Sequence, residues 1–469
     1  MKYQTVIGLE IHAELLTSTK AFCACANKFG REPNTALCPQ CMGLPGALPT
    51  LNKNAVVLAV KAGLAFGCEI QHYSAFDRKN YCYPDLPKAY QITQFYYPFA
   101  LGGFVQTEGE KISLERIHIE EDAGKLTHIG EKTLADYNRC GVPLIEIVTA
   151  PQIHSAVTAR RLTEQVALTL KYAGVCDGKM EQGSLRCDVN ISLKKEGDTV
   201  LGTRTEIKNL NSFKAIQHAI EAEEKRQMEI LEKGGKIERQ TLHFNDLTGS
   251  LTVLRTKEGL EDYRYFPEPD LPALLLSAEY IEKIAASLPE LPNIKYARYT
   301  NQLKISGDDA RLIISDPHRA EFFERAAEKT KNIKTLTAFL NTELPRIKKE
   351  CVESKSLLTA DNTAAICNMV AEGKLSATSA KEVLKITYQT GKAPLDIAKE
   401  KGLLISNDRK KIADEIKRVI SQHKAVAEQY AAGDKKVLGF LIGKALSGLG
   451  GSASPALVKE MLEKELDSL

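Results

Sequence analysis

The 469-residue chain has almost no net charge, because 63 Lys and Arg residues face 60 Asp and Glu residues. This balance excludes a nucleic-acid-binding protein whose whole surface is basic, so any such site has to be a local patch. No stretch approaches about 18 consecutive apolar residues, and the first residues, MKYQTVIGLEIH, contain no apolar signal-peptide core. We therefore expect a cytoplasmic protein that does not contact a membrane.

The sequence also lacks the common nucleotide-binding signatures. It contains neither G-x4-G-K-[ST] nor G-x-G-x-x-G after a predicted strand. The segment GFLIGKA at 439–445 resembles a phosphate loop, but its spacing is one residue short, it lacks the Ser or Thr, and its pattern is helical. If ATP binds, carboxylate-bound Mg²⁺ and Lys or Arg side chains on a sheet must hold it.

Cysteine is too sparse for a disulfide scaffold, with 11 residues in the whole chain. Four of them form a pattern typical of structural Zn²⁺: Cys23-x-Cys25, twelve residues, then Cys38-x2-Cys41. Disulfides or unconnected thiols are the alternatives, but two cysteines one residue apart bridge poorly and the expected compartment is reducing. Four protein ligands would leave this Zn²⁺ no open position for catalysis. The other seven are expected to be small buried residues: Cys68, Cys82, Cys140, Cys176, Cys187, Cys351 and Cys367.

Short segments with one apolar and one polar face recur in the first 292 residues: VIGLEIH, RIHIE, PLIEIVT, SLRCDVNIS and GTRTEIKN. This alternation predicts an antiparallel sheet with one face on a core and the other face open. A plain solvated face would carry Lys, Thr, Ser and Gln, whereas this one is rich in acids, His and Arg, which favours a polar site. Its predicted residues are Glu10, His12, His118, Glu120, Glu146, Arg186, Asp188, Asn190, Arg204, Glu206 and Lys208.

The segment RIHIEEDAGK at 116–125 ends its strand pattern in three adjacent carboxylates, Glu120, Glu121 and Asp122. Adjacent like charges repel, so fold stability alone does not account for them, whereas a bound cation does. Mg²⁺ prefers oxygen ligands and usually takes one or two carboxylates together with substrate phosphates. Glu10, Glu120 or Glu121, and Glu206 could supply these ligands from different strands.

The segment FDRKNYCYPDLPKAYQITQ at 76–94 shows neither a helical nor a strand period. A segment this rich in aromatic and charged residues is either a solvated turn or a functional loop on a rigid frame. Lys79 and Lys88, with Tyr81 and Tyr83, suit the binding of phosphates and of a nucleic-acid end.

The pattern changes along the chain, which predicts an α+β protein in three parts. Residues 1–292 form the sheet domain, with two helices at 155–174 and 212–235 and the cysteine pattern at 23–41. Residues 293–405 have helical periodicity throughout. Residues 406–469 form a small helical tail, in which nine Lys and Arg residues face five Asp and Glu residues between 407 and 444.

Long motifs across essentially the whole chain resemble the B subunit of the bacterial-type aspartyl/glutamyl-tRNA(Asn/Gln) amidotransferases. They include GLEIHAEL, CPQCMGLPGALP, FDRKNYCYPDLPKAYQITQ, RIHIEEDAGK, DYNRCGVPLIEIVT, RTEIKNLNSF and DYRYFPEPDLP. Cys82 and Ala89 depart from the pattern, where the family often has Phe and Gly.

This resemblance implies a cradle domain distantly like the glutamine synthetase catalytic fold, a helical domain and a tail that contacts tRNA. It implies a ligase that uses ATP to phosphorylate the side-chain carboxylate of Glu-tRNA(Gln), Asp-tRNA(Asn) or both, after which ammonia displaces the phosphate. Ammonia would come through a channel from a glutaminase, the A subunit, and the C subunit would tether the two in a heterotrimer. The chain itself has no serine-nucleophile signature and no clear Cys/His pair for releasing ammonia from glutamine.

The pattern and the resemblance together assign roles to particular residues. The expected Mg²⁺ ligands and catalytic residues are Glu10, His12, Glu120, Glu121 and Glu206, with Lys79 as a further catalytic residue. The expected substrate- or phosphate-binding residues are Lys88, Arg186, Asp188, Asn190, Arg204, Lys208, Tyr81 and Tyr83. Cys23, Cys25, Cys38 and Cys41 are the expected Zn²⁺ ligands.

Two other interpretations come from different protein classes. A non-catalytic, zinc-containing tRNA-binding module would carry the same cysteines, but the recurrence of acids on one sheet face argues against it. The related archaeal protein, which is specific for glutamate, carries a large inserted domain, for which 469 residues leave no room.

Overall fold

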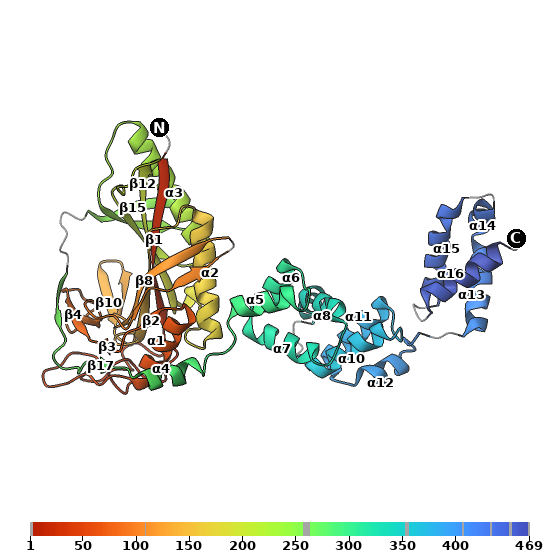
Figure 1. The fold of residues 1–469 in the computed structure, drawn as a ribbon, viewed down its shortest axis with the longest axis horizontal. Coiled ribbons are helices and arrows are strands. Elements are labelled where there is room, and N and C mark those ends of the chain that lie inside the picture. The colour runs from red at the N-terminus through yellow and green to blue at the C-terminus, as the bar shows by residue number, and fades with distance from the viewer. Residues whose placement is uncertain are drawn as a thin grey trace. The chain divides into compact units, whose positions relative to one another are not determined.

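The computed structural model describes residues 3–107, 109–256, 263–351, 356–405, 408–431, 434–449 and 453–467. Two compact units divide the chain, Met1–Ile294 and Lys295–Leu469. Within these described ranges, all the strands belong to the first unit, and the second is helical (Figure 1). The architecture is therefore α+β, as the sequence predicts.

A ten-stranded sheet forms the centre of the first unit, in the order β15-β14-β13-β12-β1-β11-β8-β6-β2, with β7 also paired to β8. All its pairings are antiparallel except β13 with β14, which run parallel. The strands are β1 (Tyr3–Glu14), β2 (Glu69–Ile70), β6 (Ala100–Leu101), β7 (Phe104–Gln106), β8 (Lys111–Glu121), β11 (Pro143–Thr149), β12 (Leu185–Lys195), β13 (Thr205–Leu210), β14 (Gln240–Asn245) and β15 (Ser250–Thr256).

One face of this sheet packs on helices and forms the core. Ile7, Leu9 and Ile11 of β1 are at most 1% exposed and belong to one cluster with apolar residues of the helices. Ser155 and Ser212 cap the two helices that the sequence predicts in this region, and each side chain accepts a backbone N–H of the first turn. The helices of this unit are α1 (Lys53–Ala65), α2 (Ala156–Tyr172), α3 (Phe213–Glu232), α4 (Ala278–Ala285) and the short 3₁₀ helix η1 (Met180–Gln182).

Alternation then leaves the even-numbered residues of β1 on the opposite face. Glu10 lies opposite Asp188 of β12, and His12 lies opposite Glu146 of β11. Glu146 in turn lies opposite His118 of β8. Directly opposite residues on neighbouring strands share a face, so this register gathers the polar side chains of four strands.

Three smaller sheets complete the unit. β3 (Tyr73–Ser74) pairs with β17 (Leu274–Leu275), and β9 (Lys125–Ile129) forms a hairpin with β10 (Lys132–Asp136). β4 (Asp77–Asn80) lies between β5 (Tyr90–Thr93) and β16 (Arg264–Pro267). The two ends of the segment 76–94 are therefore strands, and the prediction that it has no regular structure is wrong there.

In the described residues of the second unit, all the regular elements are helices. The GFLIGKA segment lies in helix α15, as predicted. The last four α-helices share an apolar core that includes Ile416, Leu441 and Leu462. None of the helices in the described ranges has the length and apolar content needed to cross a membrane. The elements are α5 (Pro292–Asn301), α6 (Gly307–Ile314), α7 (Pro317–Ala327), α8 (Ile333–Ala338), the π-helix η2 (Phe339–Glu343), α9 (Leu344–Glu350), α10 (Ala360–Ala371), α11 (Ala377–Thr390), α12 (Pro394–Glu400), α13 (Arg409–Gln422), α14 (Lys424–Ala431), η3 (Lys435–Val437), α15 (Leu438–Gly448) and α16 (Pro455–Leu466).

Candidate active site and metal centres

The open face of the central sheet, here called the polar floor, lines a cavity of about 420 Å³. The strands β1, β8, β11, β12 and β13 contribute to it. Lys79 of β4, Thr93 of β5, Tyr265 of β16 and a residue next to β14 also line it. Nine of the predicted site residues line this cavity: Glu10, His12, Lys79, Glu120, Asp188, Asn190, Arg204, Glu206 and Lys208. Period-2 alternation predicts eight of these nine on one sheet face, all except Lys79, and the structure brings them to one cavity.

A first cluster of possible metal ligands contains His12, Glu120 and Glu146, whose ligand atoms all lie within 4.8 Å of one another. The Nε2 atom of His12 is 3.3 Å from Oε1 of Glu120 and 3.7 Å from Oε2 of Glu146. His118, beside this cluster, places its Nε2 atom 3.1 Å from Oε2 of Glu146. Two carboxylates and an imidazole in this arrangement can hold a divalent cation.

The charges of this cluster support one another. Burial disfavours the charged form of His118, but Glu146 and Glu120 outweigh it and raise the pKa of His118 to about 9. Burial likewise works against both carboxylates, but the hydrogen bond and charge of His118 together with the charge of His12 lower the pKa of Glu120 and of Glu146 below the ordinary value. The cluster is therefore an ionised group of acids at neutral pH.

A second cluster consists of Glu10, Asp188 and Glu206, again within 4.8 Å of one another. The Nζ atom of Lys208 lies 2.6 Å from Oδ2 of Asp188 and 2.8 Å from Oε1 of Glu206. Asn190 donates a hydrogen bond of 3.0 Å to Glu10. Burial and the neighbouring acids raise the pKa of Glu10 above its ordinary value, so a cation at this cluster would favour its ionised form.

Two predicted residues, Glu121 and Lys88, do not line the cavity. Glu121 follows Glu120 in β8 and therefore points to the other side of the strand. There its side chain forms an ion pair with Lys88 and accepts the backbone N–H of Ile92 at 3.0 Å. Both side chains are at most 7% exposed, so each satisfies the other's charge inside the protein.

Three more predicted residues lie outside the cavity lining. Arg186 lies opposite His12 in the register of β1 and β12, and its side chain donates a hydrogen bond of 2.7 Å to Asp122, which belongs to neither cluster. Tyr81 packs edge-on against Tyr263, which does line the cavity, and Tyr83 is exposed. Tyr81 and Tyr83 thus belong to the surroundings of the site.

Several residues that line the cavity or could bind a metal ion have no assigned role in the sequence analysis. Glu146 is predicted on the polar face but not among the metal ligands. The alternation in PLIEIVT, which puts Glu146 on the same face as His12 and Glu120, is the sequence signal for it. Arg116, Arg239, Tyr263 and Tyr265 also line the cavity. Arg116 shares the alternation of β8. Tyr263 and Tyr265 lie in the motif DYRYFPEPDLP, to which the sequence interpretation gives no site role, and Arg239 reaches the site through tertiary packing.

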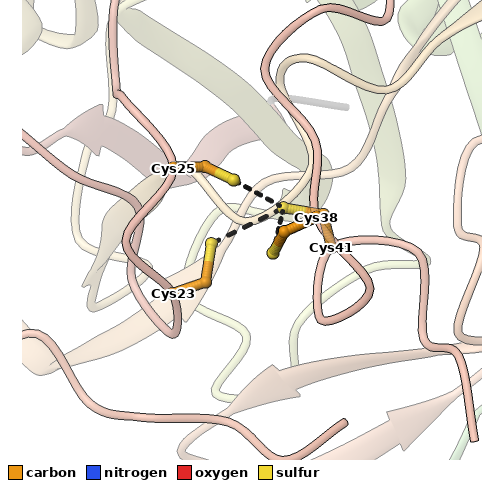
Figure 2. Close-up of side chains that lie close together, drawn as sticks. All are labelled: Cys23, Cys25, Cys38 and Cys41. Carbon is orange, nitrogen blue, oxygen red and sulfur yellow. Dashed lines mark hydrogen bonds between the residues drawn. The ribbon is translucent and has the colours of Figure 1, made fainter.

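The four predicted zinc ligands lie together in two loops between β1 and α1 (Figure 2). The Sγ atom of Cys41 is 3.5 Å from that of Cys23, 3.7 Å from that of Cys38 and 3.8 Å from that of Cys25. A tetrahedral site with Zn–S bonds of about 2.3 Å has S–S edges of about 3.8 Å, so the arrangement fits Zn²⁺. The Cys23 hydrogen bond and the charge of Lys20 outweigh burial and lower the pKa of Cys41 to about 4.

The remaining seven cysteines are free. Six of them are buried, as predicted, but Cys82 is exposed, so the prediction of burial is wrong for that residue. Cys82 lies in the connection between β4 and β5.

Residues 5–282, which contain the polar floor and the four cysteines, match the family described as the GatB/GatE catalytic domain. Residues 321–466 match the GatB domain family. A protein of Persephonella marina is 45% identical over 473 residues, covering 99% of this chain and 100% of the relative. A protein of Ruminiclostridium cellulolyticum is 46% identical over 477 residues, covering 100% and 98%. Both are named as the B subunit of the aspartyl/glutamyl-tRNA(Asn/Gln) amidotransferase.

The chain belongs to this family. The predicted resemblance is thereby confirmed over the full length. Within the GatB/GatE catalytic-domain match, the polar floor is the described surface that combines two ligand clusters with a cavity.

Proposed function

We propose that this chain is the B subunit of a tRNA-dependent amidotransferase and that the polar floor activates the side-chain carboxylate of Glu-tRNA(Gln), Asp-tRNA(Asn) or both. The carboxylate attacks the terminal phosphorus of ATP, ADP leaves, and an acyl phosphate forms. Ammonia then attacks the acyl carbon and phosphate leaves, which yields the amide. The observation that carries this proposal is the pair of metal-ligand clusters side by side in one cavity.

The two clusters would hold Mg²⁺, which neutralises phosphate charge during phosphoryl transfer when it is bound. The ligands would be His12, Glu120 and Glu146 in one cluster and Glu10, Asp188 and Glu206 in the other. Both sets consist mainly of oxygen donors, which fits this hard cation.

The cations around the clusters have separate roles in the proposal. Arg116, Arg204 and Arg239 line the cavity and bind the phosphates of ATP. Burial disfavours a charged Lys79, but Glu120, Tyr265 and Glu146 outweigh it and raise its pKa, so Lys79 stays charged. Its ammonium, 4.8 Å from the centre of the Tyr263 ring, orients the reacting carboxylate or the transferred phosphate.

The rest of the proposal concerns architecture and partners. The cradle, 1–292, is related to the glutamine synthetase fold, Zn²⁺ bound by the four cysteines stabilises it, and 293–405 and 406–469 are separate domains. The basic tail contacts the body of the tRNA. The glutaminase of the complex, its A subunit, supplies ammonia through a channel, and the C subunit completes a cytoplasmic heterotrimer.

The test is an assay of ATP-dependent amidation by the complete complex on the two charged tRNAs, with phosphate release from ATP measured in parallel. Glu120→Gln keeps the size of the side chain but removes a metal-binding charge, so both activities should fall roughly 100-fold while tRNA binding is retained. Glu131→Gln, an exposed acid between β9 and β10, is the control and should act as wild type. Full activity of Glu120→Gln would favour the non-catalytic tRNA-binding module.

A further inference from the structure

A completely buried lysine lies beside the four cysteines. Lys20 is 0% exposed, and its Nζ atom donates hydrogen bonds to the Ala36 carbonyl at 2.8 Å and to the Sγ atom of Cys41 at 3.4 Å. In the described part of the chain, Lys20 forms no ion pair with a carboxylate. A buried ammonium without a counter-charge is strongly unfavourable. Glu121 lies nearby but is paired with Lys88, so the cysteine cluster is the group in direct contact that can supply that charge.

Lys20 also joins the two cysteine pairs mechanically. Its backbone N–H donates to the carbonyl of Cys25 in the first pair at 3.0 Å. Its side chain meanwhile reaches Ala36 and Cys41 at the second pair. One residue thus contacts both halves of the ligand set, which fixes the side chain where the thiolates converge.

The charges favour the same role. Four thiolates around Zn²⁺ carry a net charge of −2, and one ammonium in contact reduces it to −1. Cys41 is the one buried member of the four, so its charge is the least accessible to water. Hydrogen bonds to ligand atoms around a metal commonly set the affinity of the site.

We propose that Lys20 is the internal counter-ion of the zinc site and that its charge, more than its hydrogen bond to Ala36, determines how long Zn²⁺ is retained. This inference rests on the proposed zinc site. Zinc analysis of the wild-type complex separates the two: absence of zinc there refutes the site itself, whereas zinc retained equally by wild type and the Lys20 variants refutes only the role of Lys20.

The experiment measures zinc per chain and the rate of zinc release to a chromogenic chelator in the complete complex. Lys20→Met removes both the charge and the hydrogen bonds, while Lys20→Gln keeps a donor for Ala36 but no charge. Both variants should release zinc at least roughly tenfold faster than wild type. The control is Lys28→Met, which removes an exposed lysine between the two cysteine pairs and should release zinc at the wild-type rate. A wild-type release rate in Lys20→Gln would overturn the proposal in favour of a hydrogen-bonding role.

A second variant keeps the proposal testable even if Lys20→Met does not fold. Replacing the partly exposed ligand Cys25 by His removes one negative charge from the site while still offering a zinc-binding atom. The double variant Lys20→Met/Cys25→His should therefore regain soluble yield and zinc retention relative to Lys20→Met, approaching the Cys25→His variant. If the second substitution brings no recovery, lost packing or lost hydrogen bonds explain the effect of Lys20, and charge does not.

Discussion

The four-cysteine cluster and the polar floor both gather metal ligands, but they do so in opposite ways. The cysteines come from a 19-residue segment, Cys23–Cys41, and their four soft ligands would fill every position of a tetrahedral ion. The acids of the floor come from strands spread between β1 and β13 and border a cavity of about 420 Å³. A filled coordination sphere can only support structure, whereas an open one leaves room for substrate.

The two regions also differ in how they balance charge. Lys20 is the one described cation that contacts the thiolates. On the floor, acids alternate with Lys208, His118 and Lys79, so that each carboxylate has a cation nearby. The floor therefore has internal counter-charges for its geometry without an ion, whereas four thiolates would need a bound cation to balance their charge.

The largest effect expected from this comparison is at Glu146. Glu146→Gln removes an acid that, like Glu120, contacts both histidines of the floor, so ATP-dependent phosphate release with charged tRNA should fall roughly 100-fold or more. A thermal melt measured above about pH 9, where the ion pair with His118 no longer contributes, should change little, because glutamine keeps the size and one acceptor. Near-normal phosphate release would remove Glu146 from the proposed ligands and leave the first cluster incomplete.

Cys38→Ser should have the opposite signature. Loss of one thiolate should release Zn²⁺ and lower the melting temperature by several degrees, because metal binding contributes directly to folding. Phosphate release measured well below the melting temperature should persist, since the floor is a separate site. Metal analysis combined with a thermal melt tests this, and an unchanged melt with no zinc in the wild type would contradict it.

The stability of the protein should depend on pH through His118 of the polar floor. Glu146 and Glu120 raise the pKa of His118 to about 9 in the folded protein. The charged His118 therefore contributes its full stabilisation below about pH 6.5, the pKa of a free histidine, and this stabilisation is lost as the pH rises through 9. Without added Mg²⁺, wild type should therefore lose stability between pH 6.5 and 9, and His118→Gln should lose less. Denaturant unfolding at several pH values measures this difference, and parallel curves for the two proteins would argue against the ion pair.

The smallest effect concerns the turn next to the floor. Ala89 is exposed and has φ +61°, a conformation in which a Cβ costs about 1–2 kcal/mol. Glycine relieves this strain but adds about 0.4–1 kcal/mol of unfolded-chain entropy, so Ala89→Gly should stabilise by up to about 1.6 kcal/mol. Ala297→Gly, at an exposed position of α5, should instead destabilise by about 1 kcal/mol. Urea unfolding of both variants distinguishes backbone strain from a general effect of glycine.

The sequence could predict those features that depend on residues close together in the chain. The cysteine pattern and the alternation around Glu10, His12 and Glu120 are local, and both led to residues that the structure brings together. Arg239 and Tyr263 reach the cavity only through the pairing of distant strands, which no local pattern encodes. The short strands β4 and β5 were missed because charged, aromatic and proline residues conceal their alternation.

The parallel pairing of β13 with β14 escaped prediction for a related reason. The alternation within GTRTEIKN shows which residues face the open side, but it carries no information on the direction of the neighbouring strand. α3 connects these two strands, and a helical crossover of this kind permits a parallel pair.

The adjacent residues Glu120 and Glu121 face opposite sides of β8, one toward the cavity and the other toward Lys88. This division limits how the chain length can vary during evolution. Deleting or inserting one residue within β8 ahead of this pair would exchange the two faces, placing Glu121 in the cavity and removing Glu120 from it. Length changes should therefore be tolerated at the tip of the β9–β10 hairpin but rejected within β8, and a scan of single-residue deletions would trace that boundary.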